Sequence, residues 1–295
     1  MPEPVKILVT GANGQLGKEL KELSPSFPKL DFIFLSRTDL PIHHYEMVRD
    51  FFKVYKPSFF INCAAYTAVD RAEQEKDLAM QVNGESVGVL AAICKENDCR
   101  FIHISTDYVF DGNATEPYTE DSLPNPQSVY GASKLEGEKQ ALQFNGESII
   151  IRTSWVYSEF GKNFVKTLMK LMSEKKEISV VNDQTGSPTC ALDLAGAILK
   201  IVANTLTQLK NWKPGIYHYS NSGVISWYEF AVAIKEITGA DCIIHPIPTS
   251  SYPTPAKRPV YSVLNTKKIQ QEFDIVIPEW KQSLAKCISK IKTGS

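Results

Sequence analysis

The fold follows from Val5-Lys6-Ile7-Leu8-Val9-Thr10-Gly11-Ala12-Asn13-Gly14-Gln15-Leu16-Gly17, where an apolar run leads into a glycine-rich turn and then into a helical pattern. Strand, glycine-rich turn and helix in this order are the context that a dinucleotide phosphate loop requires. In that role Gly11 allows the tight turn, Gly14 lets the backbone approach a pyrophosphate, and Gly17 lets the helix pack closely on the strand. The stretch therefore predicts a nucleotide site where the first helix begins.

Strand and helix patterns alternate over the rest of residues 1–155, which is typical of βαβ units. We therefore predict an α/β fold with a doubly wound parallel Rossmann sheet, and we assign residues 1–155 to an NAD(P)-binding domain. The strands are expected at 32–35, 59–62, 101–104 and 149–151, and the helices at 47–55, at 78–94 and from Tyr130.

The pattern is looser over residues 156–295, which we interpret as mainly a smaller α+β substrate-binding lid. A helix near 190–205 is expected to return to the sheet. Ser226-Trp227-Tyr228-Glu229 fits a capping box and predicts the start of another helix. The remaining expected elements are helices at 163–172 and from about 278, and strands at 178–181, 216–219 and 243–244.

Tyr130 lies four residues ahead of Lys134, which puts both side chains on one face of a helix. A free phenol has a pKa of about 10 and is a poor acid near neutrality. A nearby ammonium group favours the phenolate and lowers that pKa. The pair therefore predicts a proton donor and acceptor for an oxygen that alternates between carbonyl and alcohol.

The predicted strand ends carry further candidates. Thr106 and Asp107 follow the 101–104 strand, where side chains face the ligand crevice of a parallel sheet. Arg37 follows the second strand and would meet a 2′-phosphate, which favours NADPH, whereas the nearby Asp39 keeps NADH open as an alternative. His103 lies inside an apolar strand, and we interpret it as a hydrogen-bonded core histidine.

Composition argues against several classes of partner. The formal net charge is −1 and no long charged run occurs, so we expect no nucleic-acid partner. No stretch approaches the ~20 apolar residues of a membrane span, and Met1–Lys6 does not look like a signal peptide. The six cysteines are scattered, which indicates reduced core thiols and a cytoplasmic protein.

Three separated motifs, Thr10-Gly11-x-x-Gly14-x-x-Gly17, Ser105-Thr106-Asp107-Tyr108 and Tyr130-x-x-x-Lys134, together resemble the extended short-chain dehydrogenase/reductase superfamily. Longer runs resemble the dTDP-4-dehydrorhamnose reductase family within it. These runs are 62–70, 105–110, 152–157, 182–184 and 252–259.

The resemblance implies that a nicotinamide cofactor gives hydride to the C4 ketone of dTDP-4-dehydro-β-L-rhamnose and yields dTDP-L-rhamnose. It implies Tyr130, Lys134 and Thr106 as the catalytic set, with Lys134 also holding the nicotinamide ribose. The implied cofactor-binding residues are Gly11, Gly14, Gln15, Leu16, Gly17, Arg37, Asp39, Leu40, Ala65, Tyr66, Thr67, Tyr130 and Lys134. The implied substrate-binding residues are Thr106, Asp107, Trp155 and, on the diphosphate, Arg258.

Two other functions on the same fold stay open. One is a sugar-nucleotide dehydratase or epimerase. A dehydratase often carries Asp-Glu straight after the threonine, whereas Thr106 is followed by Asp107 and Tyr108. The regulatory subunit of methionine adenosyltransferase also resembles this family and binds a partner enzyme. The complete set of Thr106, Tyr130 and Lys134 argues against that reading.

We expect no metal ion and a monomer, with a homodimer left open. Some bacterial relatives join two chains around magnesium held by glutamates, one of which follows a Gly-x-Pro-Thr run by three residues. Here that position is Leu192, which cannot bind a hard cation, and the tail after Glu279 contains no carboxylate side chain. Asp193 is adjacent, but one step along a helix turns its side chain by about 100°.

Overall fold

The computed structural model describes residues 5–208 and 211–294. Residues 1–4, where no signal peptide was expected, and Ser295 at the end of the C-terminal tail lie outside the described residues. Within the described ranges, no helix is both long enough and apolar enough to cross a membrane.

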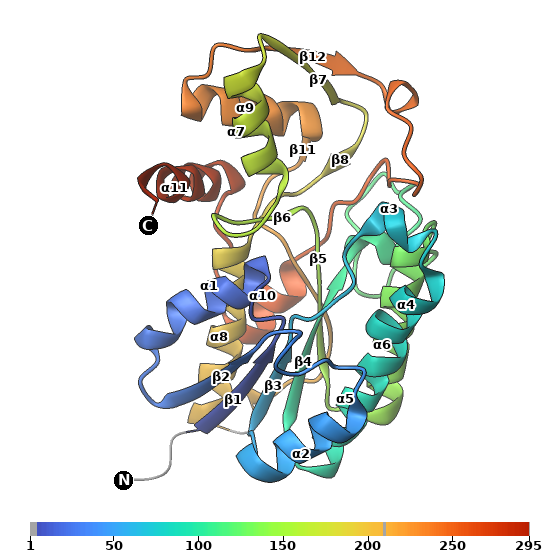
Figure 1. The fold of residues 1–295 in the computed structure, drawn as a ribbon, viewed down its shortest axis with the longest axis vertical. Helices are drawn as coiled ribbons and strands as arrows, with labels where there is room; N and C mark the ends of the chain where they lie inside the picture. The colour runs from blue at the N-terminus through green and yellow to red at the C-terminus, as the bar shows by residue number, and fades with distance from the viewer. Residues whose placement is uncertain (1–4, 209–210, 295) are drawn as a thin grey trace.

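A six-stranded parallel sheet forms the larger part of the molecule, in the order β10-β5-β4-β3-β1-β2 (Figure 1). The central strands are apolar on both faces, as strands covered by helices on both sides must be. The strand order reverses between β1 and β3, which opens a crevice at their carboxyl ends. The strands are β1 (Val5–Thr10), β2 (Leu30–Leu35), β3 (Phe59–Asn62), β4 (Arg100–Thr106), β5 (Ile149–Thr153) and β10 (Gly215–Tyr219).

Helices cover both faces of this sheet, so the predicted doubly wound α/β fold is confirmed. One face buries apolar side chains of α1 (Gln15–Leu23), α8 (Ala191–Thr207) and α10 (Lys267–Phe273). The other face packs against α2 (Tyr45–Tyr55), α5 (Ser86–Glu96) and α6 (Val129–Phe144), and Figure 1 shows these two helix layers on opposite sides.

The helix expected at 78–94 is interrupted. Short α3 (Val69–Ala72) and α4 (Lys76–Met80) precede it, and a π-helical turn at Gln81–Glu85 joins α4 to α5. A π turn inserts one extra residue into a helix and often marks a functional position. Here it carries Asn83, whose buried side chain bonds to the site described below.

The strand expected at 216–219 belongs to the large sheet, although we placed it in the smaller half. Residues 215–219 pair with 149–153 in parallel register. The pattern of a short buried strand is the same in either place, so local sequence did not distinguish them. The expected helix near 190–205 is α8 and packs against α1. A domain boundary at residue 155 stays a prediction.

The smaller part of the molecule, at the top of Figure 1, contains a second apolar core that includes Phe230. Ser226 and Glu229 form the expected capping box at the start of α9. The helices here are α7 (Phe164–Glu174), α9 (Trp227–Thr238) and α11 (Trp280–Thr293). The strand pairs are β7 (Glu177–Val181) with β12 (Ile243–Ile247), β8 (Thr185–Gly186) with β11 (Ile225–Ser226), and β6 (Val156–Tyr157) with β9 (Thr189–Cys190). Short 3-10 turns span Ser24–Ser26, Asp107–Val109 and Thr249–Ser251.

Candidate active site

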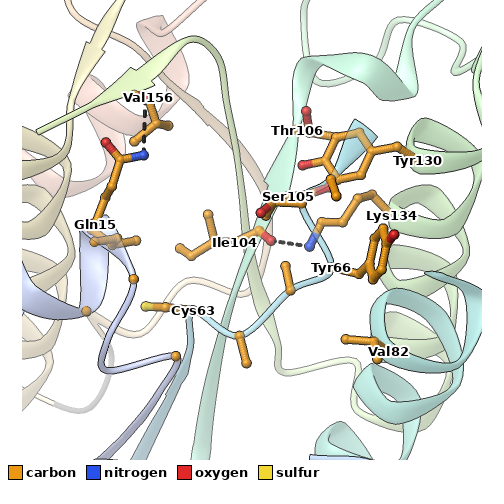
Figure 2. A pocket seen from close by; sticks show the side chains of 18 of the residues that line it. Gln15, Cys63, Tyr66, Val82, Ile104, Ser105, Thr106, Tyr130, Lys134 and Val156 are labelled. Carbon is orange, nitrogen blue, oxygen red and sulfur yellow. Dashed lines mark hydrogen bonds between the residues drawn. The ribbon is translucent and has the colours of Figure 1, made fainter. Parts of the chain in front are cut away.

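A cavity of about 830 Å³ lies at the carboxyl ends of the central strands, where parallel sheets place their ligands. Figure 2 shows its walls, with Gln15 on one side and Tyr130 and Lys134 on the other. The cavity brings together fifteen of the predicted site residues, and it leaves out Asp39 and Arg258. The fifteen are Gly11, Gly14, Gln15, Leu16, Gly17, Arg37, Leu40, Ala65, Tyr66, Thr67, Thr106, Asp107, Tyr130, Lys134 and Trp155.

The glycine-rich turn has the backbone geometry of a phosphate loop. Gly11 has φ +69, and a Cβ there would lie 2.6 Å from the carbonyl carbon of Cys63. A Cβ on Gly17 would collide with the carbonyl oxygen of Gly11. Helix α1 follows with Gly14 as its N-cap, so its free amide groups and positive dipole end lie at the cavity wall.

The loop after β6 closes this end of the cavity, and the sequence did not point to it. The Gln15 side chain donates to the backbone oxygen of Val156 at 3.4 Å (Figure 2) and accepts from Asn163 at 3.0 Å. Gly161 and Lys162 line the same wall. Because this loop lies far from Gln15 in the chain and has no motif, only the fold brings the two together.

The end of β2 favours a phosphate over a hydroxyl group. Arg37 is exposed and lines the cavity together with His43. The Asp39 carboxylate instead accepts the backbone amide of Ser36 at 2.8 Å and its hydroxyl at 2.6 Å. These bonds hold the pKa of Asp39 below its usual value. Asp39, whose presence left NADH as an alternative cofactor, therefore uses its carboxylate to hold the turn at Ser36.

Tyr130 reaches the cavity from the first turn of α6, opposite the end of β4. Ser128 caps this helix by accepting the amide of Gly131 at 3.1 Å. Burial raises the pKa of Tyr130 to about 12, and a hydrogen bond with Thr106 acts against the rise. The spacing of Tyr130 and Lys134 predicts that the lysine lowers the pKa of the phenol, whereas burial raises it. The phenol therefore keeps its proton at neutral pH, as a proton donor must.

Thr106 and Asp107 form the wall beside the phenol. The Thr106 hydroxyl donates to Oδ1 of Asp107 at 2.9 Å. Burial raises the pKa of Asp107 to about 6. Its Oδ2 is buried and has no hydrogen-bond partner among the described residues. A buried acceptor beside a cavity is satisfied at low cost by a ligand hydroxyl.

Lys134 is almost fully buried, and its amine donates to the backbone oxygen of Ile104 at 2.6 Å (Figure 2). The same nitrogen lies 3.1 Å from Nε2 of His103. Burial lowers the pKa of Lys134 to about 8. His103 is thus a core histidine, as expected, but it also contacts the candidate catalytic lysine.

Asn83 is a further residue that holds the cavity wall, and no sequence pattern pointed to it. It accepts the backbone amide of Tyr66 at 2.8 Å and donates to the Tyr66 carbonyl and to Ser133, each at 3.0 Å. It therefore ties the cavity wall after β3 to the Tyr130 helix. An asparagine inside a helical pattern gives no signal in sequence, because the π turn that aims it inward was not predicted.

The two remaining substrate candidates differ in position. Trp155 lines the cavity and stacks on Trp227, with ring centroids 3.5 Å apart, so it also joins the second core. Arg258 pairs with Asp70 at 2.7 Å and lies outside the cavity lining. Its Nη1 atom is buried and unpaired among the described residues. Arg258 as a diphosphate ligand therefore stays a prediction.

Known proteins match nearly the whole chain. The family model described as "RmlD substrate binding domain" matches residues 5–293. The spore coat polysaccharide biosynthesis protein SpsK of Bacillus subtilis is 42% identical over 280 residues, covering 95% of each chain. The dTDP-4-dehydrorhamnose reductase of Aggregatibacter actinomycetemcomitans is 39% identical over 285 residues, covering 95% of this chain and 97% of that protein.

A solved structure agrees. The dTDP-4-dehydrorhamnose reductase of Bacillus anthracis, crystallised in complex with NADP, superposes with a TM-score of 0.91 at 37% identity. It covers 97% of this chain and 99% of its own. With the glycine loop, Thr106, Tyr130 and Lys134 around one cavity, the chain belongs to the dTDP-4-dehydrorhamnose reductase family.

Proposed function

We propose that the chain reduces the C4 ketone of dTDP-4-dehydro-β-L-rhamnose to dTDP-L-rhamnose, with NADPH as the hydride donor. One observation carries the proposal: a buried, protonated Tyr130 phenol faces the same cavity as a glycine-rich phosphate loop. A reductase needs both, because hydride and proton must reach the two ends of one carbonyl group. Family membership supports the choice of substrate.

The residues present fit a dinucleotide. The positions of Gly11 and Gly17 leave no room for a side chain beside the loop, and the α1 N-terminus supplies amide donors for a pyrophosphate. Arg37 suits an adenosine 2′-phosphate, and a relative's structure in complex with NADP supports the same cofactor. Ala65, Tyr66 and Thr67 would border its far side. When bound, NADPH supplies the hydride.

The catalytic residues divide the remaining work. Tyr130 would donate its phenolic proton to the C4 oxygen as the oxygen gains charge. The Thr106 hydroxyl would turn from Asp107 to donate to the same oxygen. Lys134 would hold the nicotinamide ribose. The unpaired Oδ2 of Asp107 would accept a hydroxyl of the sugar, and Trp155 would pack against it.

The test is oxidation of NADPH, followed optically, with dTDP-4-dehydro-β-L-rhamnose made from dTDP-glucose by the two preceding conversions. We expect steady turnover and a product with the chromatographic mobility of dTDP-L-rhamnose. A protein that binds NADPH tightly but does not oxidise it with this substrate would favour a regulatory NADP-binding subunit. Release of water from dTDP-glucose without added reductant would favour a dehydratase.

We also propose that the protein works in the cytoplasm as a monomer. The support is that all six cysteines, which lie in the described parts of the chain, are free thiols. Five of them are buried, so they are unavailable for cross-linking. Analytical ultracentrifugation at micromolar concentration tests the assembly, and a dimer would require an interface other than a shared metal.

A further inference from the structure

A chain of buried polar groups lies behind Lys134, on the side away from Tyr130. Thr10 at the end of β1 donates its hydroxyl to Oδ1 of Asn62 at 2.7 Å. The amide nitrogen Nδ2 of Asn62 lies 3.1 Å from Nδ1 of His103. The other ring nitrogen, Nε2, lies 3.1 Å from the Lys134 amine. Thr10, Asn62 and His103 are at most 1% exposed, so water does not compete for these contacts.

The orientation of the Asn62 amide is fixed by the backbone. The N–H of Ala64 lies 3.2 Å from Oδ1 of Asn62 and can only donate. Rotating the amide by 180° would set its NH₂ group against that N–H. Oδ1 therefore faces Ala64, and the NH₂ group faces His103.

This orientation decides which ring nitrogen of His103 carries the proton. Because the Asn62 amide donates, Nδ1 must be the acceptor. Burial holds the pKa of His103 well below its usual value, so the ring is neutral. A neutral imidazole with an acceptor at Nδ1 has its proton on Nε2. The Nε2–H group then points at the amine of Lys134.

A donor facing this amine constrains its protonation. An ammonium group has no lone pair, so Nε2–H and an ammonium at 3.1 Å would repel each other. A neutral amine accepts from Nε2–H with its lone pair and donates one hydrogen to the Ile104 carbonyl. One hydrogen is then left for the cavity that Lys134 lines.

We propose that His103, oriented by Asn62, is a positioning residue for Lys134, which directs the amine into the cavity and disfavours its ammonium form. The proposal rests on the role of Lys134 in the proposed reaction. Its structural part is independent of turnover, because it concerns the free protein.

The other ionisable groups near Lys134 do not offset this effect. Glu138 lies one turn further along α6 and acts to raise the pKa of Lys134, but it is committed to Arg152 and Ser105. Cys63, from the segment after β3, is held in its neutral thiol form because burial raises its pKa to about 12. His103 is therefore the ionisable side chain that hydrogen-bonds the amine directly.

The first test measures the ring itself. In protein labelled with ¹⁵N-histidine, long-range proton–nitrogen correlations distinguish the two neutral tautomers and the charged ring. The chain has five histidines, and the His103→Gln variant identifies the signal that belongs to position 103. We expect a neutral ring protonated at Nε2 from pH 5 to pH 9. A ring protonated at Nδ1, or a charged ring at pH 7, would overturn the proposal.

The second test compares two uncharged substitutions. His103→Gln can turn its carbonyl oxygen toward an ammonium group, whereas His103→Phe fills the space without a polar atom. We expect His103→Gln to raise the pKa of Lys134, followed by ¹³Cε-lysine NMR, by about one unit, and His103→Phe not to raise it. The alkaline limb of kcat/KM should move with the amine in His103→Gln.

Thr10→Val is the matched control, because it removes one bond of the chain while the Ala64 N–H still orients Asn62. It should leave the Lys134 titration where it is in the parent protein. Equal pKa values for Lys134 in the Gln and Phe variants would show that His103 merely fills space, and would overturn the proposal. Should a variant not fold, the tautomer measured in the parent protein decides.

Discussion

Arg152 of β5 and Glu138 of α6 form an ion pair whose side chains are each 2% exposed, with Nη2 2.6 Å from Oε2. Glu138 lies one turn beyond Lys134, so the pair fixes the Tyr130 helix to the sheet. A second bond, 2.5 Å from the Ser105 hydroxyl to Glu138, joins β4 to the same carboxylate. The catalytic helix is therefore held by charge as well as by apolar packing.

Glu138→Ala should destabilise the protein by about 3–5 kcal/mol, because it leaves the Arg152 guanidinium buried without its partner. Urea unfolding followed by tryptophan fluorescence measures the loss. The matched control is Asp50→Ala, which breaks the exposed pair with Lys53 and should leave the unfolding free energy almost unchanged. A loss for Glu138→Ala as small as that of the control would show that Arg152 finds another partner.

Tyr130→Phe should lower kcat by roughly 10²–10⁴-fold, because the ring still packs and only the proton donor is lost. NADPH affinity, measured by fluorescence titration, should stay within about threefold, which corresponds to less than 1 kcal/mol. Turnover within threefold of the parent enzyme would remove Tyr130 from the mechanism.

Arg37→Ala should lower kcat/KM for NADPH by roughly 10–100-fold, the loss expected for a charge-assisted contact with a phosphate. The value for NADH should change far less, since NADH has no 2′-phosphate. Asp39→Ala serves as the comparison, because its carboxylate is bound to Ser36. A preference for NADH in the parent enzyme that survives Arg37→Ala would contradict this assignment.

Asp107 should make folding less favourable as pH rises. Its pKa is raised from 3.8 to about 6 in the folded protein. Between those values the folded state binds the extra proton, so stability falls as pH rises through this window and stays lower above it. The unfolding free energy of Asp107→Asn minus that of the parent should therefore grow by about 2–3 kcal/mol from pH 4 to pH 8. Urea titrations at both pH values measure this difference in unfolding free energy. A difference that is the same at pH 4 and pH 8 would show that folding does not raise the pKa of Asp107.

EDTA should not change activity or sedimentation. Leu192 has no oxygen ligand for a hard cation, and the adjacent Asp193 accepts hydrogen bonds from Asn221 and Ser283. Within residues 5–208 and 211–294, no group of three or more metal-ligating side chains occurs. An EDTA-sensitive dimer would contradict this prediction.

The fold and the strand-end residues could be predicted because each rests on a local pattern. Glycine spacing located the loop, apolar runs located the strands, and the i, i+4 spacing of Tyr130 and Lys134 located the helix face. The family prediction is confirmed by a family model that matches residues 5–293 and by a relative that covers 95% of the chain.

What sequence could not give is pairing between distant residues. Asn83 reaches the cavity wall because a π turn aims it inward, and His103 matters because it contacts Lys134. Gly161 and Lys162 line the cavity because their loop folds back on Gln15. The pKa of Tyr130 likewise depends on burial, which spacing does not measure. Each of these needed the folded chain.

The position of β10 also matters during synthesis. Translation releases β1 to β5 first, and the free edge of β5, with its buried Ile149, Ile150 and Ile151, then waits for residues 215–219 to leave the ribosome. An unpaired apolar edge is a template for association with other chains. The nascent protein is therefore most prone to aggregation while it makes its smaller half, and ribosome pausing within residues 156–214 should lower the yield of soluble enzyme.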